Sequence, residues 1–194
     1  EFLADAKKLT RDTNGDGNLD FAMAGGPAVS VLLGNGDGTL GPAAEYALGG
    51  EANVVVAGDV TGDGRPDLIT GPGSFGGAIR LLRGRGDGTF DAAAAIVNTP
   101  ETYNFKLSLA DVNGDSKLDL IAAYSHGNGQ PPDSLVVHLG HGDGTFTAQP
   151  GGAGLPGFPM FLTTADLNGD GHPDLLVLNQ TYNHAFSVFL GSGD

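Results

Sequence analysis

Four nine-residue segments carry oxygen-bearing side chains at one repeated spacing. Each has Asp at positions 1, 5 and 9 and Asn or Thr at position 3. On a tight turn these groups converge on one point, and Ca²⁺ takes six to eight hard oxygen ligands at about 2.3–2.6 Å. We expect position 7, whose side chain varies, to add its backbone carbonyl. The pattern therefore predicts about four Ca²⁺ sites, one per segment. The predicted metal-site residues are Asp12, Asn14, Asp16, Asn18, Asp20, Asp59, Thr61, Asp63, Arg65, Asp67, Asp111, Asn113, Asp115, Lys117, Asp119, Asp166, Asn168, Asp170, His172 and Asp174.

Other interpretations of these acidic loops are weaker. An EF-hand places a bidentate Glu at position 12, but position 12 here is Met23, Thr70, Ala122 or Val177. Turns built on Asn or Asp and Gly also form without metal, yet four copies with the same three acids favour a cation. Magnesium is the alternative ion, and it prefers to keep several waters. The flanking segments indicate strands, so we expect the ion to clip a β-hairpin.

The loops belong to a longer repeat, which must position them. Their first aspartates are 47, 52 and 55 residues apart, and a Gly-rich turn recurs at residues 34–40, 84–90, 140–146 and 191–194. Four short apolar runs per unit predict four strands, and a period of about 40–50 residues is typical of a β-propeller blade. A roll of parallel strands has much shorter repeats.

We therefore predict an all-β fold, a β-propeller of four-stranded antiparallel blades with four repeats present. The approximate repeats are 1–43, 44–93, 94–147 and a truncated 148–194.

Composition narrows the classes of partner. The net charge of −14 disfavours nucleic acid, whose phosphates the surface would repel. The chain lacks Cys, which excludes disulfides and thiolate metal sites, and no apolar run reaches membrane-spanning length. The start at Glu1-Phe2 carries no signal peptide and resembles the interior of a longer protein.

The acidic loops, the Gly-rich turns and the period together resemble FG-GAP/VCBS repeats, the calcium-bearing blades of integrin α-subunit propellers and of many secreted proteins. The resemblance covers essentially the whole chain. It implies that each loop joins the first two strands of a blade and binds calcium through its acids. Thr61, Ser116 and a missing last outer strand depart from the family pattern. Family rings usually close with seven blades, so we expect a partial ring, a four-bladed ring, or one completed by other copies or by a longer chain.

The sequence shows no catalytic constellation, so we expect a non-enzymatic module for extracellular recognition or adhesion, with an unknown protein or glycan ligand. The extracellular location follows from calcium, since weak sites fill only where calcium is abundant. The alternatives are a carbohydrate-binding lectin, which the absence of Trp weakens, and an accessory domain of a larger secreted enzyme. Ligand loops are expected on the rim opposite the acidic loops, at residues 124–133 and 149–159. Arg85-Gly86-Asp87 is interpreted as a hairpin turn, because other repeats have Asn, His or Ser before Gly-Asp.

Overall fold

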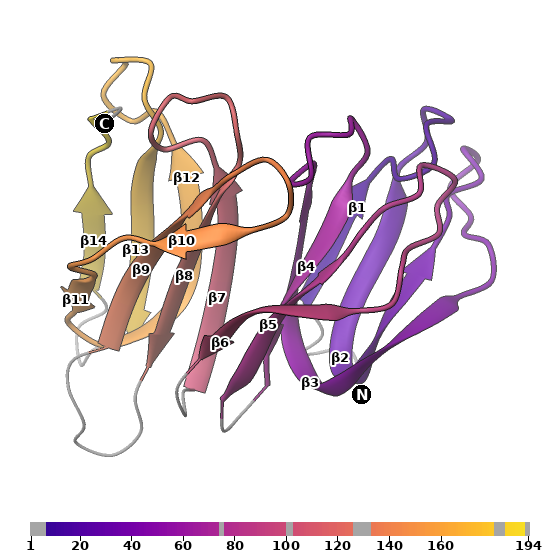
Figure 1. Cartoon of the computed structure of the whole chain (residues 1–194), viewed down its shortest axis with the longest axis horizontal. Helices are drawn as coiled ribbons and strands as arrows, with labels where there is room; N and C mark the ends of the chain where they lie inside the picture. Colours follow the sequence, from indigo (N-terminus) through magenta and orange to yellow (C-terminus); the bar gives the residue numbers. More distant parts are fainter. Residues whose placement is uncertain (1–6, 74–75, 100–102, 126–132, 181–184, 193–194) are drawn as a thin grey trace.

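The computed structural model describes residues 7–73, 76–99, 103–125, 133–180 and 185–192. These residues form antiparallel strands and no helix, as predicted for an all-β protein. Three sheets stand side by side in sequence order, with the last at the left and the first at the right of Figure 1.

The first sheet has six strands in the order β1-β2-β3-β4-β5-β6. Their bounds are β1 Lys7–Arg11, β2 Asp20–Leu32, β3 Ala44–Gly58, β4 Asp67–Pro72, β5 Gly77–Leu82 and β6 Ala94–Thr99. The second sheet runs β10-β9-β8-β7, with β11 also paired to β9. Its bounds are β7 Tyr103–Ala110, β8 Asp119–Ser125, β9 Asp133–Gly140, β10 Phe146–Ala148 and β11 Ala153–Leu155. The third sheet is β12 Phe158–Ala165, β13 Asp174–Gln180 and β14 Ala185–Phe189.

The long strands β2 and β3 depart from the expected pattern of four short strands per repeat. In β2, residues 20–24 pair with β1, whereas residues 28–31 pair with β3. In β3, residues 44–47 pair with β2 and residues 54–58 pair with β4. Gly26 and Gly49 have φ of 73° and 69°, which lets the chain bend without leaving the sheet. Each long strand thus replaces two predicted ones, and the first two repeats share one sheet.

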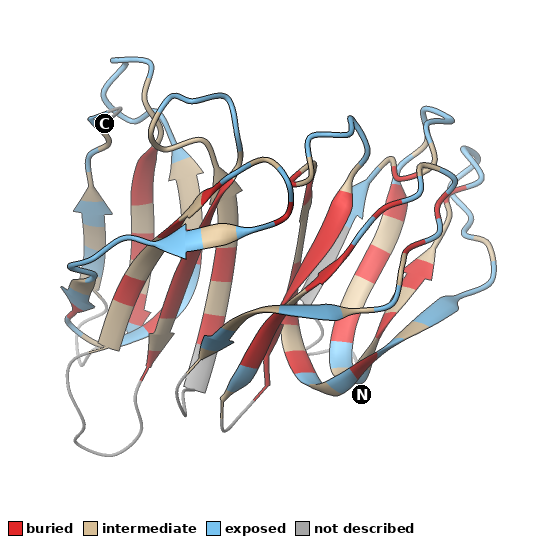
Figure 2. Cartoon of the chain, viewed as in Figure 1, coloured by how far each residue is buried: buried red, intermediate tan, exposed pale blue. Residues whose placement is uncertain are grey.

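The core lies between successive repeats. One buried cluster lies within the first sheet, a second joins the first sheet to the second, and a third joins the second to the third. Figure 2 shows the buried segments concentrated in the inner strands of the sheets. Phe105 on β7 is 1% exposed and stacks on Tyr124 with ring centroids 5.4 Å apart. Each repeat therefore buries its apolar residues against its neighbour, as repeat proteins do.

Candidate metal sites

The four acidic loops occupy equivalent places in the fold. They connect β1 to β2, β3 to β4, β7 to β8 and β12 to β13. Since each follows the first strand of its antiparallel unit, all four lie along one edge of the molecule, the upper edge in Figure 1. The structure therefore places every predicted metal-site residue on that edge.

The first aspartate of each loop holds the turn closed. In the first loop, Asp12 Oδ1 accepts a hydrogen bond from the Gly15 N–H at 2.7 Å, and Oδ2 accepts one from the Gly17 N–H at 2.9 Å. Asp59, Asp111 and Asp166 accept from their own positions 4 and 6 at 2.7–2.9 Å. The backbone N–H donors thus fix the orientation of the first-position carboxylate, whose oxygens face the inside of the turn.

In the first and fourth loops, the side chains at positions 3 and 5 lie next to each other. Asn14 Nδ2 donates to Asp16 Oδ2 at 3.0 Å, and Asn168 Nδ2 donates to Asp170 Oδ2 at 2.8 Å. The Asn18 N–H donates to Asp16 Oδ1 at 2.7 Å. The bond from the Asn18 backbone, followed by that from Asn14, lowers the pKa of Asp16. The Asp16 carboxylate is therefore ionised and open to solvent.

Position 7 presents its backbone to the loop, and in the first three loops its side chain lies against a glycine of the Gly-rich turn, Gly36, Gly86 or Gly142. The N–H groups of Arg65, Lys117 and His172 each donate to the aspartate two residues earlier at 2.8–2.9 Å. Lys117 Nζ also lies 3.7 Å from Asp115 Oδ2. These contacts agree with a position whose side chain is free to vary. Its carbonyl as a ligand stays a prediction.

The ninth position has a role that sequence reasoning missed. Its four aspartates are at most 1% exposed, and both oxygens of each accept backbone hydrogen bonds. In the second loop, Asp67 Oδ2 accepts from Val60 and Thr61 N–H at 3.1 Å, while Oδ1 accepts from Gly84 N–H at 2.8 Å. The equivalent bonds to the Gly-rich turns come from Gly34, Gly140 and Gly191 at 2.8–2.9 Å.

Each ninth-position aspartate therefore ties its acidic loop to the Gly-rich turn of the same repeat. The signal was present in the sequence, because a glycine that opens a Gly-rich turn follows each of these aspartates after 14, 17, 21 or 17 residues. Burial raises the pKa of Asp119, which the bonds from Gly140 and Val112 oppose and the nearby Asp115 and Asp111 charges reinforce. The three carboxylates of this loop thus repel one another.

The donor set fits a hard cation. Each loop offers three carboxylates and an amide or hydroxyl oxygen, which suit Ca²⁺, and the repulsion felt by Asp119 is what a cation would relieve. Positions 1, 3 and 5 would hold the ion, with position 9 sharing oxygens already used in the fold. Bound calcium would supply positive charge and cross-linking. Among the described residues, no three His, Cys, Asp or Glu side chains form a preassembled metal cluster.

The Gly-rich turns are closed by their own side chains. Asp87 Oδ1 accepts from the Thr89 N–H at 2.9 Å and its hydroxyl at 2.5 Å, and Asp37 and Asp143 do the same with Thr39 and Thr145. Arg85 pairs with Asp91 at 2.6 Å. The Arg85-Gly86-Asp87 triplet therefore has the same turn structure as its counterparts, in agreement with the turn interpretation.

Ser116 provides a test of the loop geometry. It occupies position 6, where the other loops have Gly, and its φ of 65° is the only positive value at a non-glycine among the described residues. A side chain in this region costs about 1–2 kcal/mol. We expect Ser116→Gly to raise the free energy of unfolding by about 1 kcal/mol in a urea titration. Gly64→Ser, at the same position with φ of 80°, should lower the free energy of unfolding by a similar amount. If both variants are as stable as the parent chain, a side chain at this positive φ causes no strain.

The three histidines that the structure describes do not form a ligand set. His138 on β9 is buried, and burial lowers its pKa. His141 and His172 are on the surface, with His141 Nε2 2.8 Å from Thr147 Oγ1. His126 and His184 lie outside the described residues, as does most of the candidate ligand loop at 124–133.

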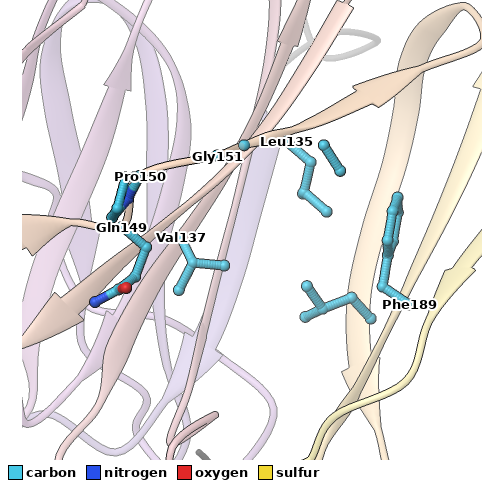
Figure 3. Close-up of a pocket in the computed structure, with 9 residues that line it drawn as sticks. Leu135, Val137, Gln149, Pro150, Gly151 and Phe189 are labelled. Atoms are coloured by element: carbon cyan, nitrogen blue, oxygen red, sulfur yellow. The ribbon is translucent and has the colours of Figure 1, made fainter.

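A pocket of about 200 Å³ lies between the second and third sheets, beside the other candidate loop. Leu135 and Val137 of β9 line one side and Leu175 and Phe189 the other, with Gln149, Pro150 and residues 151–153 completing the wall (Figure 3). Gln149 supplies the one polar side chain of this lining. The pocket thus combines an aromatic ring, aliphatic walls and an amide.

Side-by-side antiparallel sheets, each with an acidic loop at one edge, define a propeller-type repeat protein. The model of the FG-GAP-like repeat matches three times, over residues 12–70, 59–122 and 111–177. Because these matches span most of the sequence, the chain belongs to the FG-GAP-like repeat family, as the resemblance implied. The described residues contain no helix long and apolar enough to cross a membrane.

Comparison with solved structures places this fold among known ones, with 40 matching chains. One is a lectin from Agrocybe aegerita, described in terms of specific recognition of non-reducing terminal N-acetylglucosamine. The similarity has a TM-score of 0.51 at 21% identity over 99% of this chain, and the chain spans 64% of that lectin. At this identity the likeness concerns the fold alone. The comparison with curated protein sequences gave no match.

Proposed function

We propose that this chain is a non-catalytic, calcium-binding propeller-type module that serves in extracellular recognition. The observation that carries the proposal is the fourfold repetition of one loop structure, with position 1 fixed by two backbone donors and position 5 exposed to solvent. An isolated turn of this kind needs no metal. Four copies bring at least twelve carboxylates to one edge of a chain with a net charge of −14, which a divalent cation would stabilise.

The test is thermal and urea unfolding in calcium and in chelator. A ligand that binds only the folded state stabilises it by RT ln(1 + [L]/Kd), about 1.4 kcal/mol per site at ten times Kd. We expect a clearly higher midpoint in calcium, and a smaller rise in magnesium. Calorimetric titration gives the affinity. Millimolar to submillimolar Kd would agree with an extracellular setting, whereas tight binding at cytosolic calcium levels would contradict it.

The matched control removes only the exposed carboxylates. A variant with Asp16→Ala, Asp63→Ala, Asp115→Ala and Asp170→Ala keeps every buried aspartate and the bonds that close the turns. It loses the four fifth-position acceptors of backbone N–H groups, so its midpoint in chelator should fall below that of the parent chain, and calcium should not raise that midpoint. Identical midpoints of the parent chain in calcium and chelator would refute calcium binding.

A second candidate function is glycan binding, which the pocket in Figure 3 favours. Sugars bind to aromatic rings and amides, and Phe189 and Gln149 supply both. The Agrocybe aegerita lectin shares the fold, so N-acetylglucosamine is the first ligand to titrate. Binding that Gln149→Ala abolishes, and that the exposed control Gln180→Ala leaves intact, would support this function. If no glycan on an array binds, glycan binding is excluded and a protein is left as the ligand.

A further inference from the structure

The outer face of the last sheet is apolar and uncovered. Phe186 is 67% exposed, Val188 50%, Leu190 67% and Leu167 52%. In the strand pairing, Val188 lies opposite Leu176 and Phe186 opposite Leu178, so these side chains form one continuous surface. We call it the forward face. It consists of Leu167, Leu176, Leu178, Phe186, Val188 and Leu190.

Earlier repeats bury the same positions against the next repeat. Leu81 pairs with Ile69 as Val188 pairs with Leu176, and Leu81 is 3% exposed where Val188 is 50% exposed. Val60, at position 2 of the second acidic loop, is 2% exposed, whereas Leu167 in the fourth loop is 52% exposed. The forward face is therefore one half of an interface that the chain builds between its own repeats.

The first repeat exposes the other half. Leu19 is 64% exposed, but its counterpart Leu118 packs into the cluster between the first two sheets, where its side chain lies against Gly58. Leu40 is 46% exposed, but its counterpart Phe90 is 4% exposed.

The contact that covers Phe90 shows which neighbour is involved. Phe90 packs edge-on against Tyr46 with ring centroids 5.6 Å apart, and Tyr46 lies in the part of β3 that pairs with β2 of the preceding repeat. The Gly-rich turns show the same difference, because a Cβ on Gly88 would lie 2.6 Å from Leu33 of the preceding repeat, whereas Gly38 has open space. Leu19, Leu40 and the turn at Gly38 therefore form the backward face of the array.

We propose that a second copy of this chain docks its backward face on the forward face, head to tail. The two faces lie on opposite ends of the row of sheets in Figure 1. Such heterologous contacts close into rings when the rotation allows. Two copies bring together eight acidic loops, and propellers typically have 4–8 blades. The contact would resemble the packing already present between the sheets.

Light scattering on the whole 194-residue chain tests this proposal. At about 100 µM, an interface with Kd near 1 µM is saturated, and we expect a mass of twice 19.6 kDa or a higher multiple. Phe186→Glu and Leu19→Glu each place a charge on one face, and each should raise the dissociation constant at least about tenfold. Both sites are exposed, so at concentrations where the parent chain is monomeric the unfolding midpoints of the variants should match that of the parent chain. Ala148→Glu adds the same charge outside both faces and should have no effect.

Mixing the two variants separates head-to-tail docking from other modes. Phe186→Glu keeps its backward face and Leu19→Glu its forward face, so an equimolar mixture should regain a one-to-one dimer although neither variant associates alone. A parent chain that stays monomeric at this concentration overturns the proposal and leaves the forward face to further repeats or another partner. Association that survives Leu19→Glu overturns it as well, because the forward faces would then pair with each other.

Discussion

Replacing Asp67 by Ala is expected to lower the free energy of unfolding by about 3 kcal/mol or more. Its carboxylate is 0% exposed and accepts the N–H groups of Val60, Thr61 and Gly84. Alanine leaves these donors without an acceptor, and each buried unsatisfied group costs about 1–3 kcal/mol. The loss also separates the acidic loop from the Gly-rich turn that follows β5, so two turns are weakened by one substitution.

Urea unfolding in chelator measures this effect apart from any metal. Asp67→Asn should also destabilise, because it turns one acceptor oxygen into an NH₂ group that faces backbone donors. The control is Asp63→Ala in the same loop, which removes an exposed carboxylate that accepts the Arg65 N–H, and should cost less than about 1 kcal/mol. Equal losses for Asp63→Ala and Asp67→Ala in chelator would show that the ninth position matters only as a metal ligand.

The acidic loops show how far the sequence could predict the site. Their place between two strands followed from the apolar runs on either side, and the turn bonds of Asp12 follow from local chemistry that a single segment contains. The burial of Asp67 and Asp119 could not be read locally, because it depends on where Gly84 and Gly140 come to lie. Because binding a metal was already a sufficient explanation for the acid at position 9, its role in tying the loop to the Gly-rich turn was missed.

The sheets show the same division between local and tertiary information. Alternating apolar runs predicted antiparallel strands and their repetition, which the fold confirms. They did not predict that β2 and β3 would continue through Gly26 and Gly49, since a glycine between apolar runs is equally typical of a tight turn. Which face of each strand is covered also depends on the neighbouring repeat. The exposure of Phe186 and Leu19 is therefore a property of the array rather than of their own segments.

Phe105→Ala tests whether that inter-repeat packing holds the array together. Phe105 is 1% exposed and belongs to the cluster that joins the first sheet to the second, where its ring lies close to Gly71 of β4 and stacks on Tyr124. Removing a buried Phe side chain costs about 3–5 kcal/mol, since apolar contacts are lost and a cavity remains. We expect a loss in this range from urea unfolding. Phe105→Leu should cost distinctly less, because most of the volume is kept.

The steepness of the urea unfolding transition, measured by the m-value, is as informative as its midpoint. In an array whose repeats contact only their neighbours, stability is a sum of repeat and interface terms. Weakening the junction at Phe105 should therefore let the sheets before and after it unfold separately, which lowers the m-value as well as the midpoint. Phe186 is an exposed aromatic residue of the last sheet, so Phe186→Ala should change neither the m-value nor the midpoint of the monomer. If Phe105→Ala unfolds in one transition with an unchanged m-value, the sheets are coupled by more than this cluster.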